Sequence, residues 1–241
     1  MKHLRSIVTL TALFSTASLL HADIPVKAGD KVAFLGDSIT QAGQGSPTGY
    51  VQLIGRGLEA NGVKIEIIGA GISGHKSNDM LGRLDRDVLS KKPQWMTLSC
   101  GVNDVWHGAN GVPLDDYKKN ITAIVDQAQA AGVKVVILTS TMIGEDQPNP
   151  NNQKLASYNA FLRTLQKDKK CLLADLNAEM QAAIAEAAKT QPKPANGNYL
   201  TSDGVHMAAA GDQMMALGVL KGFGLNAAEL AKAKAAWGDK K

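Results

Sequence analysis

The sequence is short of several features that mark whole classes of protein. Its 241 residues include only 2 cysteines, and aromatic residues make up only 5%. So low a cysteine content excludes a disulfide-built scaffold. Cys100 and Cys171 lie in separate apolar runs and are predicted to be two separate buried thiols, although an oxidising compartment would permit them to pair.

The chain also carries only a small excess of positive over negative charge. Lys and Arg total 26 against 22 Asp and Glu, which gives a net charge of +4. This positive charge is too small and too scattered for a nucleic-acid-binding surface, so no nucleic-acid partner is expected. No Pro/Ser-rich linker, charge block or internal repeat divides the chain, and a single domain over residues 23–241 is expected.

Motifs for metals and cofactors are missing or incomplete. Neither H-E-x-x-H nor C-x-x-C occurs, so no metal is implied. Residues 69–74 (GAGISG) match the dinucleotide pattern G-x-G-x-x-G, but the next apolar run ends at Cys100 without the acidic residue that such sites use, and no cofactor is expected. The G-x-S-x-G elbow of α/β-hydrolases also fails, because Thr40 occupies its last position.

Residues 1–22 have the layout of a secretory signal peptide. Lys2 and Arg5 form a basic start, residues 7–20 are apolar with interspersed Ser and Thr, and Ala22 ends the segment. A membrane-spanning anchor would need about 20 strongly apolar residues, and this run is shorter and interrupted. We expect cleavage after Ala22, no stable membrane anchor, and a secreted or periplasmic protein.

Apolar runs alternate with stretches of helical periodicity along the rest of the chain. This order, with nearly continuous apolar runs, predicts an α/β fold in which helices cover both faces of a parallel sheet. The predicted strands are residues 31–35, 63–68, 95–100, 133–139 and 171–175, and the predicted helices are residues 50–61, 78–89, 114–131, 153–167, 178–189 and 208–220, with a terminal helix from 227.

Residues with catalytic chemistry follow the predicted strands. Ser38 comes after the first strand, and a serine hydroxyl becomes a nucleophile when a base takes its proton. His206 is the candidate base, and Asp203 could orient its imidazole. Gly74 and Asn103 could donate hydrogen bonds to the oxyanion that forms during acyl transfer.

Each of these segments also has a purely structural explanation. Ser38 or Thr40 could simply cap the following helix, and Asp203 could cap the helix from Met207 after an Asp-Gly turn. His75 and His107 lack such a carboxylate in sequence and are expected at the rim or in the cleft.

Taken in order, four short blocks resemble those of the SGNH hydrolases, also called the GDSL esterase/lipase family. The blocks are residues 36–39 (GDSI), 72–74 (ISG), 101–104 (GVND) and 203–206 (DGVH). The first block has Ile39 where the family name has Leu. The resemblance implies a flavodoxin-like three-layer α/β/α sandwich with a five-stranded parallel sheet.

The resemblance also implies a role for each residue. Ser38 would be the nucleophile, His206 the base and Asp203 its partner, while the Ser38 N–H, the Gly74 N–H and the Asn103 side chain would form the oxyanion hole. Gly71 is the alternative to Gly74.

The expected function is that of an exported serine esterase that removes O-acetyl groups from a carbohydrate through an acyl-enzyme on Ser38. The expected partner is a small-molecule or glycan ester, with Trp106 and Tyr199 as possible sugar-stacking faces among polar loops. The alternatives are a lysophospholipase or thioesterase acting on longer acyl chains, and a non-catalytic glycan-binding relative.

Overall fold

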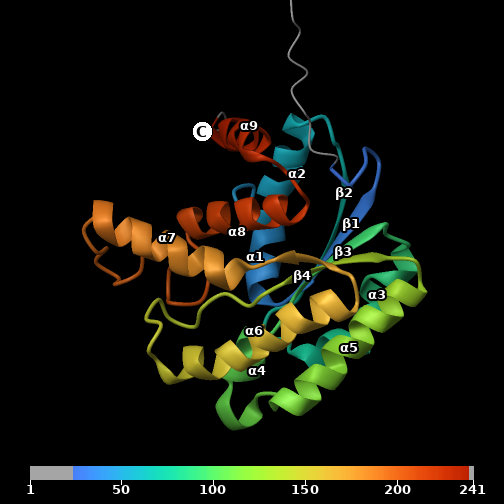
Figure 1. The fold of residues 1–241 in the computed structure, drawn as a ribbon, viewed down its shortest axis with the longest axis horizontal. Coiled ribbons are helices and arrows are strands. Elements are labelled where there is room, and N and C mark those ends of the chain that lie inside the picture. Colours follow the sequence, from blue (N-terminus) through green and yellow to red (C-terminus); the bar gives the residue numbers. More distant parts are fainter. Residues whose placement is uncertain (1–23, 239–241) are drawn as a thin grey trace, which may run out of the picture.

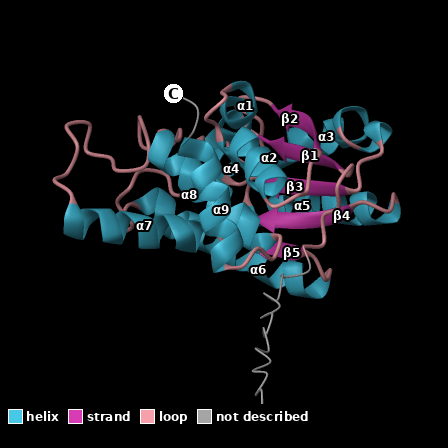
Figure 2. Cartoon of the chain, turned by 90° about the horizontal axis from the view of Figure 1, so that it is seen from above, coloured by secondary structure: helices cyan, strands magenta, loops and turns pink. Residues whose placement is uncertain are grey.

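The structure, a computed structural model, describes residues 24–238, so the predicted signal peptide over residues 1–22 lies outside the described part of the chain. At its centre is a sheet of five parallel strands in the order β2-β1-β3-β4-β5, and Figure 2 shows the strands in this sequence. The strands are β1 (Lys31–Gly36), β2 (Glu66–Gly71), β3 (Trp95–Ser99), β4 (Lys134–Leu138) and β5 (Leu172–Ala174).

Helices cover both faces of this sheet (Figure 1). On one face α2 packs against α8 and α9, and on the other α5 packs against α3 and α6. The helices are α1 (Ser38–Gly45), α2 (Tyr50–Ala60), α3 (Ser77–Asp87), α4 (Val102–Trp106), α5 (Leu114–Ala130), α6 (Pro150–Asp168), α7 (Leu176–Thr190), α8 (Ala209–Gly222) and α9 (Ala227–Gly238), with 3₁₀ turns at Leu89–Lys91 and Gly108–Asn110. The predicted three-layer sandwich is therefore confirmed.

The core lies along both faces of the central strands. All five residues of β3 are buried, as expected where helices cover a parallel sheet on both sides. Cys100 and Cys171 are both buried and unpaired, which confirms the prediction of two separate thiols. Among residues 24–238, no helix combines the length and apolarity needed to cross a bilayer.

The second strand begins later than the sequence pattern predicts. The prediction was residues 63–68, but β2 occupies Glu66–Gly71, where Gly71 pairs with Gly36 of β1. Gly69 and Gly71 of the GAGISG segment thus belong to a strand over which α1 passes closely, whereas Gly74 lies beyond its end. A Cβ atom on Gly71 would collide with the backbone of α1 at Thr40 and Gln41, so only glycine fits there.

Helix α6 begins at Pro150 rather than at the predicted Gln153. The Asn149 side chain caps this helix by accepting a hydrogen bond from Asn152 N at 3.0 Å, and proline is favoured in the first turn, where no amide donor is needed. The loop between β4 and α6 is correspondingly shorter than the run of Pro and Asn suggests.

Candidate active site

Ser38 is the first residue of α1, directly beyond the carboxyl end of β1. Asp37 caps this helix, because its side chain accepts a hydrogen bond from Ile39 N at 3.0 Å. The cap is thus Asp37, and neither Ser38 nor Thr40 is needed for it. As a first-turn residue, Ser38 has a backbone N–H without an acceptor within the helix, so this N–H can serve another group.

His206 and Asp203 lie beside this serine. His206 Nε2 is 2.9 Å from Ser38 Oγ, and His206 Nδ1 is 2.7 Å from Asp203 Oδ2. The chain therefore brings residues 168 positions apart into hydrogen-bond contact. With a proton on Nδ1 held by Asp203, Nε2 is free to accept the proton of the Ser38 hydroxyl.

Asp203 is fixed by its own turn. Its Oδ1 accepts hydrogen bonds from Val205 N at 2.9 Å and His206 N at 2.8 Å. Partial burial alone would raise the pKa of Asp203, but the hydrogen bonds from the His206 side chain and from these amides outweigh it and lower the pKa to about 2. The carboxylate therefore stays ionised at neutral pH and can stabilise a protonated imidazole.

Gly74 and Asn103 follow β2 and β3, the two strands that flank β1 in the sheet. The Asn103 side chain, which is 4% exposed, donates a hydrogen bond from Nδ2 to the carbonyl of His75 at 3.1 Å. Gly74 has a φ of 76°, a left-handed conformation that favours glycine. The Gly71 N–H instead donates to Gln44 Oε1 at 3.2 Å, which supports Gly74 rather than Gly71 as the free donor.

A buried arginine that the sequence reasoning missed ties these strand ends together. Arg83 of α3 is 3% exposed and donates to Gly36 O and Ala70 O, both at 2.8 Å, and to His75 Nδ1 at 3.0 Å. It also pairs with Asp87 at 3.1 Å. Its position within an otherwise apolar helix face, between Met80 and Leu84, was the available signal.

Arg83 also contributes to the state of His75. Burial and then the nearby guanidinium lower the pKa of His75, so its ring is held neutral and accepts the hydrogen bond from Arg83. His75 is thus a supporting residue beneath the Gly74 turn, whereas His107 is exposed.

Two buried carboxyl groups lie behind the nucleophile. Burial raises the pKa of Asp37 to about 6, opposed by the hydrogen bond from Ile39 N and assisted by the nearby Asp104. Burial also raises the pKa of Asp104, whose Oδ1 accepts from Ser77 N at 3.0 Å. The Cys100 thiol donates to Asp104 Oδ2 at 3.4 Å, and burial raises the pKa of this thiol well above its usual value, so Cys100 is not a nucleophile.

The two predicted aromatic faces differ in exposure. Trp106 is 43% exposed and stands on α4, one helical turn beyond Asn103. Tyr199 is partly buried and packs against the core, so less of its ring is available to a substrate. Asn149, Asn152 and Asn196 direct their side chains to backbone groups of their own loops.

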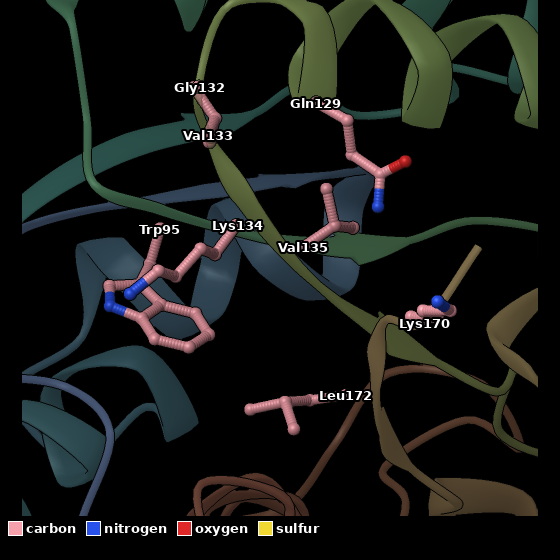
Figure 3. Close-up of a pocket in the computed structure, with 8 residues that line it drawn as sticks. All are labelled: Trp95, Gln129, Gly132, Val133, Lys134, Val135, Lys170 and Leu172. Atoms are coloured by element: carbon pink, nitrogen blue, oxygen red, sulfur yellow. The ribbon is translucent and has the colours of Figure 1, made fainter.

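A cavity of about 380 Å³ lies away from this site (Figure 3). It is lined by Trp95 and Lys134, the first residues of β3 and β4, and therefore opens at the amino ends of the strands. Lys134 Nζ sits 5.0 Å from the centre of the Trp95 ring. The lining includes no serine, histidine or carboxylate, so the chemistry is at the opposite edge of the sheet.

Comparisons with known proteins agree with this geometry. The model of the GDSL-like lipase/acylhydrolase family matches residues 34–214, a span that contains every residue of the site. The chain belongs to this family. It is a carboxylic ester hydrolase with the SGNH fold.

The relatives include several esterases. An acetylxylan esterase from Geobacillus stearothermophilus is 28% identical over 218 residues, which cover 83% of this chain and 96% of that enzyme. The crystal structure of the acetyl xylan esterase AlAXEase matches with a TM-score of 0.73 and 35% identity, covering 79% of this chain and 98% of that one. The Geobacillus stearothermophilus enzyme Axe2 matches with a TM-score of 0.72 and 26% identity over 83% and 97% of the two chains. Catalytic mutants of Axe2 replace a serine and an aspartate by alanine.

Proposed function

We propose that this protein is a serine esterase that removes O-acetyl groups from a carbohydrate through an acyl-enzyme on Ser38. The observation that carries the proposal is the continuous hydrogen-bonded line from Ser38 Oγ to His206 Nε2 at 2.9 Å and from His206 Nδ1 to Asp203 Oδ2 at 2.7 Å. The catalytic serine and aspartate of Axe2 support the roles of Ser38 and Asp203.

In the first step Ser38 Oγ attacks the ester carbonyl while His206 Nε2 takes the hydroxyl proton. The carbonyl π electrons move to the oxygen, and the resulting oxyanion accepts hydrogen bonds from the Ser38 and Gly74 amides and the Asn103 side chain. When the tetrahedral intermediate collapses, the bond to the sugar oxygen breaks and the imidazolium gives its proton to that oxygen.

In the second step water hydrolyses the acetyl-enzyme by the same route. His206 takes a proton from the water, the hydroxide oxygen bonds to the acyl carbon, and the Ser38 oxygen leaves and recovers the proton. Asp203, ionised at neutral pH, stabilises the imidazolium in both steps, so neither step needs a redox cofactor.

Ser38→Ala and its matched control test the nucleophile. Ser38→Ala should lower the turnover of p-nitrophenyl acetate by several orders of magnitude, whereas Ser73→Ala, at an exposed serine on the neighbouring strand end, should have little effect. Near wild-type turnover by Ser38→Ala would remove Ser38 from the mechanism. The non-catalytic alternative predicts that neither the wild type nor the variants hydrolyse the ester.

The proposal of a carbohydrate acetyl ester as substrate is supported by the acetylxylan esterases among the relatives and by the exposed Trp106 ring beside Asn103. Acetylated xylan should release acetate faster than acetylated pectin fragments or O-acetylated sialic acids. A preference for p-nitrophenyl octanoate over p-nitrophenyl acetate would instead indicate an apolar acyl groove and the longer-chain function.

We also propose that residues 1–22 direct export and are removed after Ala22. The basic start and the interrupted apolar run support this reading. Expression of the full chain followed by N-terminal sequencing of the exported protein should give Asp23 as the first residue. Retention of Met1 in an intact intracellular product would contradict the proposal.

A further inference from the structure

The loop between β4 and α6 supplies none of the residues assigned to the reaction, yet it contacts the segment that carries Asp203 and His206. Besides one backbone hydrogen bond, from Gly144 N to Gly204 O, the contact is made by one carboxylate, that of Glu145. Glu145 Oε1 accepts hydrogen bonds from Leu200 N at 2.8 Å and from Thr201 N and Thr201 Oγ1, both at 2.7 Å, and Oε2 accepts from Tyr199 N at 2.6 Å. Four donors on three consecutive residues thus converge on a single side chain.

Glu145 is presented by a loop that is itself held in place. Asn152 Oδ1 accepts from Ile143 N at 2.9 Å, and Asn152 Nδ2 donates to Asp146 O at 2.9 Å. Asn149 Nδ2 donates to Ile143 O and Asp146 O, both at 2.7 Å. Because both asparagines belong to the start of α6, the loop is fixed to that helix, and Glu145 has little freedom to follow its partners.

The Asp203–His206 turn is joined directly to the segment that Glu145 holds. Ala208 N donates to Leu200 O at 2.8 Å, and Ser202 N donates to His206 O at 2.9 Å, which closes residues 200–208 into one small unit. Gly144 N also donates to Gly204 O at 2.6 Å. Asp203 and His206 are three residues apart within this unit, so they move together, whereas Ser38 is on a different part of the fold.

We propose that Glu145 is a positioning residue that fixes the Asp203–His206 unit at the correct distance from Ser38. Hydrogen bonds to a carboxylate are shorter and stronger than those between neutral groups, so four of them at one anchor hold the unit tightly. Without the charge, the unit shifts as a whole: the His206–Asp203 bond survives, and the contact of 2.9 Å between His206 Nε2 and Ser38 Oγ lengthens. This inference rests on the proposed roles of Ser38, Asp203 and His206.

The test compares Glu145→Gln with Asp146→Asn in the full chain. Both changes convert an acid to its amide, but the Asp146 side chain is exposed and only its backbone carbonyl accepts hydrogen bonds. The concentration of active sites is first titrated with a fluorophosphonate, and the turnover of p-nitrophenyl acetate is then expressed per labelled site. This normalisation separates a misplaced dyad from a smaller folded fraction.

We expect Glu145→Gln to lower kcat per labelled site by about 10- to 100-fold, because a displacement of about 1 Å in a reacting group costs about that much. The rate constant for fluorophosphonate labelling should fall in parallel, KM should change little, and the midpoint of the pH–rate profile should stay where it is in the wild type. Asp146→Asn should stay within about twofold of the wild type.

Turnover per labelled site within twofold of the wild type in Glu145→Gln would overturn the proposal, as would a shifted midpoint, which would mean that the dyad itself had changed. If Glu145→Gln does not fold, Thr201→Val decides, because it removes one of the four bonds without changing the side chain's shape. A severalfold loss per site supports the proposal, and no loss overturns it. Full turnover by His206→Ala would refute the proposed function itself, whatever Glu145→Gln does.

Discussion

The buried acid next to the nucleophile makes stability depend on pH in a direction that can be worked out. Asp37 is 2% exposed, and burial raises its pKa from 3.8 to about 6. Between pH 3.8 and about pH 6, the Asp37 carboxyl is ionised in the unfolded chain but still protonated in the folded protein. Folding is therefore favoured at the lower pH, and this contribution is lost as pH rises towards 6.

The size of the effect follows from the same shift. At neutral pH the Asp37 carboxyl is ionised in both states. The change in pKa from 3.8 to about 6 means that this buried charge then lowers the free energy of unfolding by about 3 kcal/mol. Asn at this position carries no charge at any pH, and its side-chain oxygen can still accept the capping hydrogen bond from Ile39 N. Relative to the wild type, Asp37→Asn should therefore gain about 3 kcal/mol of stability between about pH 4 and about pH 7.

Urea unfolding at several pH values measures this difference directly. Acids with a lowered pKa make stability rise with pH instead. Asp87 is one of them, because hydrogen bonds from Arg86 and Arg83 lower its pKa to about 2, so only the difference between variant and wild type isolates Asp37. Asp85→Asn, at an exposed carboxylate on α3, is the matched control and should run parallel to the wild type. Parallel curves for Asp37→Asn as well would refute the reasoning.

Three further predictions concern the site. The rate of ester hydrolysis should fall at low pH, because a protonated His206 cannot accept the Ser38 proton, and a rate that does not fall on acidification would count against His206 as the base. Arg83→Lys should lower the free energy of unfolding, measured in urea, by about 2 kcal/mol, because the carbonyls of Gly36 and Ala70 each lose a donor worth about 1 kcal/mol. It should also lower kcat. Arg86→Lys, at an exposed arginine on the same helix, should change neither quantity. Trp106→Ala should raise KM for acetylated xylan about 2- to 10-fold and raise KM for p-nitrophenyl acetate less, because only the polymer can reach both the ring and Ser38. Equal effects on both esters would show that Trp106 does not bind the sugar.

The sequence was sufficient to predict the sheet, and it places the proposed site at one edge of it. Buried parallel strands are apolar along their whole length, so β1 and β3 stand out, and the carboxyl ends of such strands meet at one edge. Ser38, Gly74 and Asn103 each follow a strand of this sheet, so the sequence predicts that they lie at the same edge. Asp203 and His206 were candidates because a carboxylate three residues before a histidine can orient its imidazole, and the order of the four blocks supported the same roles.

The supporting residues could not be predicted because their partners are distant in sequence. Glu145 binds amides more than fifty residues later, and Arg83 reaches a carbonyl 47 residues away. A lone acid in a polar loop carries no signal of such contacts. The apolar helix face around Arg83 indicates that this arginine is buried, but not which carbonyls it reaches. The predicted start of β2 was also wrong. Its register is set by pairing with β1 and by the passage of α1 over Gly71, and not by local hydrophobicity.

Mass spectrometry of the protein after reaction with a fluorophosphonate tests the nucleophile most directly. The account predicts a single adduct on the peptide that contains Ser38, formed more slowly in His206→Ala and absent from folded Ser38→Ala. An adduct on another residue, or undiminished labelling of Ser38→Ala, would contradict it.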